Sequence, residues 1–137
     1  INLDEADGAW FSLAEEIVSR GGTMAIFPEG GIAREGHMEP FRPGAALLSA
    51  KTGVPIVPCA IYGTYSSVFG MRQKLLVGRP VESNCPEDMR HSKYARIIMK
   101  QAEDEVARLY SDMEKKYGDC GTYSAKKTVN AGSNAAE

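Results

Sequence analysis

Hydrophobic residues recur at steps of three or four over residues 8–20 and about 86–117, which is the spacing of one face of an α-helix. This pattern predicts a helix in each of these two ranges. A short helix is also predicted over residues 43–53, which have proline at the start and glycine at the end, the usual asymmetry of helix termini. The last helix carries one continuous apolar stripe, long enough to cover the face of a sheet. The members of the stripe are Ala95, Ile98, Ala102, Val106, Leu109, Met113 and Tyr117.

Short apolar runs between these helices predict strands. Residues 23–27 and 55–63 are interpreted as buried strands, and residues 74–82 as a third strand that Gly78 and Pro80 interrupt. Helices and strands alternate along the chain. We therefore expect an α/β fold with a layered, mostly parallel sheet flanked by helices.

Length and composition indicate one domain. A chain of 137 residues can bury one hydrophobic core, and we assign the domain to residues 1–117. Residues 118–137 are rich in small and polar residues and are predicted to be a disordered tail. The formal net charge of −2 does not favour nucleic acid as a partner. No apolar run approaches the roughly 20 residues that cross a bilayer.

The three cysteines, Cys59, Cys85 and Cys120, are far apart and odd in number. This spacing does not favour a disulfide framework or a zinc site, and it suits a reducing compartment. Cys59 lies inside an apolar run and is interpreted as a core residue. No cofactor or metal is expected.

Candidate chemistry begins where the first predicted strand runs into the sequence FPEGG. Ligands of α/β sheets bind beyond the carboxyl ends of the strands. Gly30 and Gly31 can adopt positive φ, so that successive backbone N–H groups form a concave anion site. Arg34 and Arg42 follow, and arginine binds phosphate oxygens with several donors at once. Glu29 would repel a phosphate, so we expect it to accept from backbone N–H groups or to hold an arginine. An ordinary charged surface loop is the alternative.

Other phosphate and hydrolase motifs do not fit. Gly31 and Gly36 have the glycine spacing of a P-loop, but His37 and Met38 stand where lysine and a hydroxyl residue are required. No G-x-G-x-x-G occurs, which leaves a dinucleotide fold without support. The chain also lacks a G-x-S-x-G motif, so a serine hydrolase has little support.

Three segments together carry a resemblance to a known family. They are FPEG at residues 27–30, FRPGA at residues 41–45 and VPIVP at residues 54–58. In this order and spacing they resemble the glycerolipid acyltransferase family, typified by 1-acylglycerol-3-phosphate acyltransferases. The resemblance covers roughly residues 20–65.

The resemblance implies a reaction and a binding site. An acyl group would move from acyl-CoA or acyl carrier protein to the free hydroxyl of a lysophospholipid. The FPEG loop, with Glu29 and Gly30, would hold the glycerol phosphate of this acceptor. The family often continues with Thr-Arg, where this chain has Gly31-Ile32. Arg34, two positions later than the family's arginine, is the candidate substitute. The predicted substrate-binding residues are Glu29, Gly30, Gly31, Arg34 and Arg42.

The catalytic base of the family has no counterpart in the sequence. Transfer to an alcohol needs a group that takes the hydroxyl proton, and the family uses His-x-x-x-x-Asp. Five residues after His37 and His91 stand Arg42 and Arg96. No catalytic residue is therefore assigned. We expect the catalytic segment to lie upstream, which makes this chain a C-terminal part of the domain that is inactive by itself. The alternative is a non-catalytic phosphate- or lipid-binding relative.

The implied lipid substrates also suggest where such a protein works. Peripheral membrane contact at the cytoplasmic face is the expectation that follows from the family. Arg72, Lys74 and Arg79 are interpreted as a solvated strand edge, with a basic face against a membrane as the alternative. Tyr62 is expected to cap the sheet, the alternative being part of an acyl groove.

Overall fold

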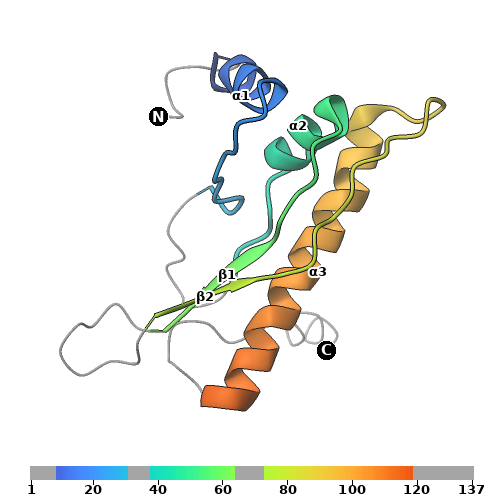
Figure 1. Ribbon diagram of the computed structural model, residues 1–137. Coiled ribbons are helices and arrows are strands. Elements are labelled where there is room, and N and C mark those ends of the chain that lie inside the picture. The colour runs from blue at the N-terminus through green and yellow to red at the C-terminus, as the bar shows by residue number, and fades with distance from the viewer. Residues whose placement is uncertain (1–8, 31–37, 64–72, 119–137) are drawn as a thin grey trace, which may run out of the picture.

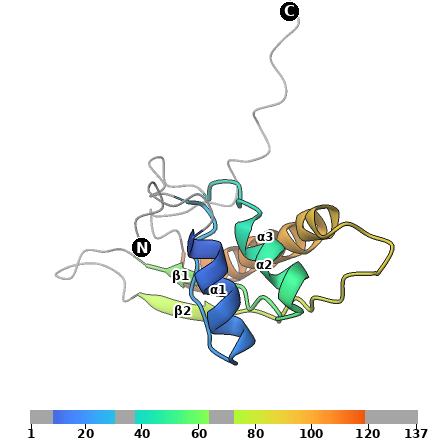
Figure 2. The same ribbon diagram turned by 90° about the horizontal axis from the view of Figure 1, so that it is seen from above.

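The computed structural model describes residues 9–30, 38–63 and 73–118. The fold is organised around a long C-terminal helix, with a short helix beside its first half and a pair of strands beside its second half (Figure 1). Another helix packs against the short helix (Figure 2). In chain order the elements are α1 Ala9–Ser19, α2 Gly44–Thr52, β1 Cys59–Tyr62, β2 Lys74–Val77 and α3 His91–Tyr117.

The three predicted helices are present. At the end of α2 the Gly53 N–H donates to the Ser49 carbonyl at 2.8 Å, which closes the last turn as the sequence asymmetry predicted. The last helix begins later than predicted. Residues 86–90 form a turn in which the Met89 N–H donates to the Pro86 carbonyl, and α3 starts only at His91.

The strands β1 and β2 form an antiparallel pair. Cys59 is opposite Val77 and Tyr62 is opposite Lys74. The predicted interruption is present, because β2 ends at Val77 and the Gly78 N–H donates across to the Pro58 carbonyl at 2.8 Å. The mostly parallel sheet is not shown, since the described strands pair antiparallel.

The core lies along one side of α3. Tyr117 is the exception in the predicted stripe, being 38% exposed, whereas Ile98 is 1% exposed. The first half of the stripe packs against α2, and the second half packs against the inner face of the strands, where Tyr62 is buried beside Tyr110. Tyr62 is thus a core residue whose hydroxyl donates to the Gly118 carbonyl. A separate cluster joins α1 to α2, built from Ala14, Val18 and Leu48.

Two predictions about buried positions are wrong. Residues 23–27 are not a strand in the structure, and Ile26 is 37% exposed while Phe27 is 76% exposed. A strand needs a neighbour that satisfies its backbone groups, and neither β1 nor β2 pairs with this segment. Cys59 is also exposed, because alternate residues of β1 face opposite sides and Ala60 and Tyr62 take the inner face.

Several expectations fall partly or wholly outside the described residues. These include the polar tail after Gly118 and the basic residue Arg72. No helix in the described ranges is long and apolar enough to cross a bilayer. Within the same ranges, no group of histidine, cysteine and acidic side chains is arranged to hold a metal ion.

Candidate functional site

The sequence FPEG forms a tight turn. Pro28 and Glu29 occupy its two central positions, and the Gly30 N–H donates to the Phe27 carbonyl at 3.2 Å. Proline favours the second position of a turn because its ring sets φ near the required value. Gly30 has φ +70°, a left-handed conformation that side chains disfavour. The residue types of this segment therefore explain its local shape.

A second segment, residues 38–42, is bound to this turn by two contacts. The Arg42 N–H donates to the Pro28 carbonyl at 2.8 Å, and the Glu39 N–H donates to Glu29 Oε2 at 2.9 Å. The Glu29 carboxylate accepts from a backbone N–H group, one of the two roles expected for it from like-charge repulsion. The turn and the segment therefore behave as one unit.

The side chain of Arg42 lies across Gly30. A Cβ atom added to Gly30 would be 2.6 Å from Arg42 Nε, 2.7 Å from Cζ and 2.9 Å from Cδ. These distances are shorter than real carbon contacts, so a side chain at position 30 would force the flexible end of Arg42 to move. Arg42 is exposed, and its guanidinium forms no hydrogen bond or ion pair within the described part of the chain. The turn thus carries an accessible positive charge with several donors.

The structure describes only part of the predicted concave anion site. The Gly30 N–H is used inside the turn, so it does not point into an open concavity. Gly31 and Arg34 lie outside the described residues, as does His37. The structure therefore brings together three of the five predicted residues, and their part in substrate binding stays a prediction. These three are Glu29, Gly30 and Arg42.

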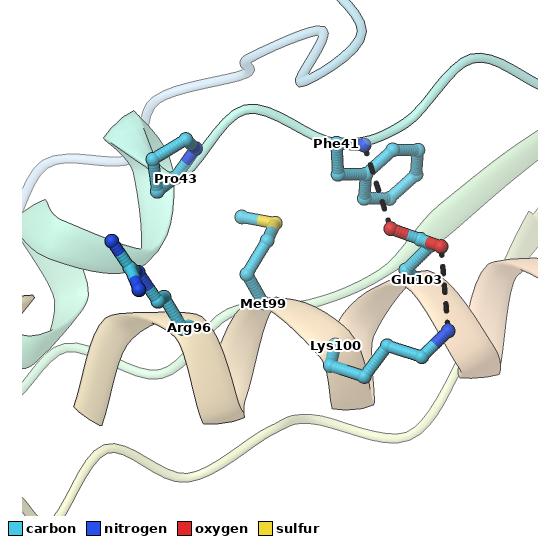
Figure 3. Close-up of a pocket in the computed structure, with 6 residues that line it drawn as sticks. All are labelled: Phe41, Pro43, Arg96, Met99, Lys100 and Glu103. Carbon is cyan, nitrogen blue, oxygen red and sulfur yellow. Dashed lines mark hydrogen bonds and ion pairs between the residues drawn. The ribbon is translucent and has the colours of Figure 1, made fainter. Parts of the chain in front are cut away.

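Helix α3 contributes a contact that the sequence did not indicate. Glu103 Oε2 accepts from the Phe41 N–H at 3.4 Å, and Glu103 Oε1 is 3.4 Å from Lys100 Nζ. Figure 3 shows both contacts. Phe41 and Glu103 are 62 positions apart, and no local pattern relates them. The ion pair of Lys100 and Glu103, three residues apart on a helix, was the only feature that the sequence could have indicated.

A cavity of about 270 Å³ lies between α3 and the segment above it. The Phe41 ring packs against the clusters on both halves of α3, while Arg42 lies across Gly30. A hydrogen bond with Asp104 and the charge of Glu103 raise the pKa of Lys100. The cavity lining is Phe41, Pro43, Arg96, Met99, Lys100 and Glu103.

The described residues offer no candidate for the catalytic base. His91 is the first residue of α3 and is exposed, in agreement with its interpretation as a surface residue. An exposed guanidinium, held beside a glycine turn, can donate hydrogen bonds to an oxyanion.

Part of the chain is similar to known proteins. The family model described as Acyltransferase matches residues 4–62. The chain is similar to chloroplastic 1-acyl-sn-glycerol-3-phosphate acyltransferases of Brassica napus, with 45% identity over 49 residues, and of Arabidopsis thaliana, with 39% identity over 49 residues. It is also similar to the human 1-acyl-sn-glycerol-3-phosphate acyltransferase beta, with 33% identity over 69 residues. No solved structure matches the chain.

These matches make residues 4–62 of the chain similar to the acyltransferase family. The matched stretch is short relative to whole proteins of the family. It covers 36% of this chain and 14% of each chloroplastic relative, and 50% of this chain and 24% of the human relative. The FPEG turn, Arg42 and β1 lie within the part that the family model matches.

Proposed function

We propose that this chain forms the acceptor-binding part of an enzyme of phospholipid synthesis. The reaction would transfer a fatty acyl group from acyl-CoA or acyl carrier protein to the free hydroxyl of a lysophospholipid such as 1-acylglycerol-3-phosphate. The hydroxyl oxygen forms an ester bond to the acyl carbon, the carbon–sulfur bond breaks, and the hydroxyl proton ends on the released thiol. The names of the relatives support this substrate class.

One observation carries the proposal: the guanidinium of Arg42 lies across Gly30 at the FPEG turn, exposed and without a partner in the described ranges. A planar guanidinium can donate two parallel hydrogen bonds to a phosphate group. Glu29 holds the segment through the Glu39 N–H, so that its own charge is committed to a backbone contact. The phosphate of the acceptor would therefore meet Arg42 first.

Other parts of the proposal rest on the sequence. Gly31 and Arg34 follow the turn directly and are proposed to add an amide and a second guanidinium to the phosphate. A lipid acceptor also implies contact with a membrane surface. We propose peripheral attachment, at the cytoplasmic face.

A non-catalytic phosphate- or lipid-binding function is the second candidate. It is favoured by one observation, that neither His37 nor His91 is followed by aspartate at the family's spacing. The two candidates differ in turnover. Incubation of the 137-residue chain with radiolabelled acyl-CoA and lysophosphatidic acid would give phosphatidic acid only if this chain catalyses by itself, and we expect none. Product formed at a rate proportional to protein would contradict this expectation.

The binding proposal is tested by comparing two lipids that differ only in the phosphate. The chain is titrated with lysophosphatidic acid below its micellar concentration and with the corresponding monoacylglycerol. We expect the phosphate-bearing lipid to bind more tightly, and Arg42→Ala to remove about tenfold of that preference. Arg90→Ala is the matched control, because Arg90 is an exposed arginine just before α3. Equal binding of the two lipids, or equal losses in the two variants, would refute the proposal.

A further inference from the structure

The segment that carries Arg42 is held from two sides. On the side of the turn, the Pro28 carbonyl and the Glu29 carboxylate accept from the N–H groups of Arg42 and Glu39. On the side of α3, the Glu103 carboxylate accepts from the Phe41 N–H. Phe41, the residue before Arg42, is therefore hydrogen-bonded to α3. This helix lies outside residues 4–62, the part that the family model matches.

Phe41 contacts α3 in two ways: its ring packs against the clusters on both halves of the helix, and its N–H donates to the Glu103 carboxylate. An open hollow of about 270 Å³ lies between Phe41 and Pro43 on one side and Met99 and Glu103 on the other (Figure 3). The Glu103 side chain is 26% exposed, and its Oε1 lies 3.4 Å from Lys100 Nζ. A partly buried acceptor loses less side-chain freedom than a fully exposed one when it binds the N–H group.

We infer that Glu103 is a positioning residue for the phosphate site. By accepting from the Phe41 N–H it sets the height of the segment above α3, and with it the place of the Arg42 guanidinium over Gly30. This inference rests on the proposed function, since it names a residue that acts on the acceptor site through Arg42.

An electrostatic role and a positioning role of Glu103 predict opposite effects of its removal on phosphate affinity. A carboxylate near an anion site weakens anion binding by repulsion, so a purely electrostatic role predicts that its removal strengthens phosphate binding, by about twofold. A positioning role predicts weaker binding, because the segment and its arginine lose their support. The sign of the change therefore separates the two roles.

The experiment titrates the 137-residue chain with glycerol 3-phosphate by calorimetry. We expect Glu103→Ala to bind about tenfold more weakly than the unchanged protein. Glu103→Gln keeps an oxygen that accepts from the Phe41 N–H and should bind within about twofold of the unchanged protein. Asp104→Ala is the matched control, because it removes the other carboxylate that pairs with Lys100, at 2.9 Å, and should also stay within about twofold.

The inference is overturned if Glu103→Ala binds as tightly as the unchanged protein or more tightly, or if Glu103→Gln is as weak as Glu103→Ala. Hydrogen exchange of the Phe41 amide provides a readout without ligand. Exchange should be faster in Glu103→Ala than in the unchanged protein and in Glu103→Gln, and equal rates in all three would also overturn the inference. The Arg42→Ala variant separates a failure of the proposed function from a failure of the positioning role of Glu103. If Arg42→Ala loses affinity while Glu103→Ala does not, the proposed function stands and the positioning role fails.

Discussion

Residues 23–30 and helix α3 are both rich in apolar side chains, but they lie in opposite environments. Ile98 of α3 is 1% exposed, whereas Ile26 is 37% exposed and Phe27 is 76% exposed. A helix satisfies its backbone groups within itself and needs only a surface to pack on. An extended segment needs a pairing neighbour, and the described strands do not supply one to residues 23–27. Hydrophobic content alone therefore does not decide which segment forms the core.

The comparison separates stability from binding. The contacts of α3 are mainly apolar and spread over two clusters. The FPEG turn is joined to residues 38–42 by polar contacts of Pro28 and Glu29, and the Arg42 guanidinium beside the turn is exposed. Substitutions of the buried apolar residues of α3 should mainly lower the free energy of unfolding, and substitutions at the turn should mainly lower the affinity for phosphate.

The largest expected effect is on the free energy of unfolding, when an isoleucine in each of the two regions is replaced by alanine. Ile98→Ala removes a side chain that is 1% exposed, and it should lower the free energy of unfolding by about 3 kcal/mol through lost burial and the cavity left behind. Ile26→Ala, at a position that is 37% exposed, should cost below about 1 kcal/mol. Urea denaturation followed by circular dichroism measures both. Equal losses would mean that the two regions contribute alike to stability.

A glycine pair sharpens the comparison at the turn. Gly30 and Gly21 have φ values of +70° and +79°, so that alanine at either position should cost about 1 kcal/mol of backbone strain. Only at Gly30 does the new Cβ meet Arg42, since nothing lies within 4 Å at Gly21.

Gly30→Ala should therefore weaken binding of glycerol 3-phosphate about tenfold, and Gly21→Ala should leave it unchanged. Urea denaturation checks that the two variants are equally stable, and calorimetry compares their affinities. If the affinity falls equally in both, the loss comes from backbone strain rather than from displacement of Arg42.

The smallest expected effect is a pH dependence on α3. A hydrogen bond from Arg108, joined by one from the Arg79 N–H, lowers the pKa of Glu105 from 4.5 to about 2. The folded state therefore favours the charged form. Its contribution to stability is present above the unfolded value of 4.5 and is lost as the pH falls from there towards 2.

Urea midpoints measured at several values between pH 6 and pH 2.5 test this assignment. The unchanged protein should lose more stability over this pH range than the Glu105→Gln variant, which has no carboxylate at position 105 to titrate. Parallel pH profiles would show that Glu105 is not held in its charged form by the fold.

Local patterns predicted the helices and the positive φ of Gly30, and failed where distant residues decide the outcome. The stripe from Ala95 to Met113 is a property of one segment, as is the Pro-Glu-Gly sequence that forms the turn. Residues 23–27 would form a buried strand only if another strand paired with them. The Phe41 N–H likewise donates to Glu103, which is 62 positions away. Cys59 was misplaced because both faces of β1 carry apolar residues, so that alternation did not reveal which face is exposed.

The central claim is that the Arg42 guanidinium, held across Gly30, binds the phosphate of the acceptor. The most direct measurement follows the arginine Nε resonances of the ¹⁵N-labelled chain by NMR during titration with glycerol 3-phosphate, with Arg42→Lys used to assign the Arg42 signal. The account predicts a saturable shift of the Arg42 Nε–H resonance, while the resonance of Arg20, which is paired with Glu16 at 2.7 Å, stays in place. An Arg42 resonance that does not move at saturating glycerol 3-phosphate, or that moves only in parallel with Arg20, would contradict the claim.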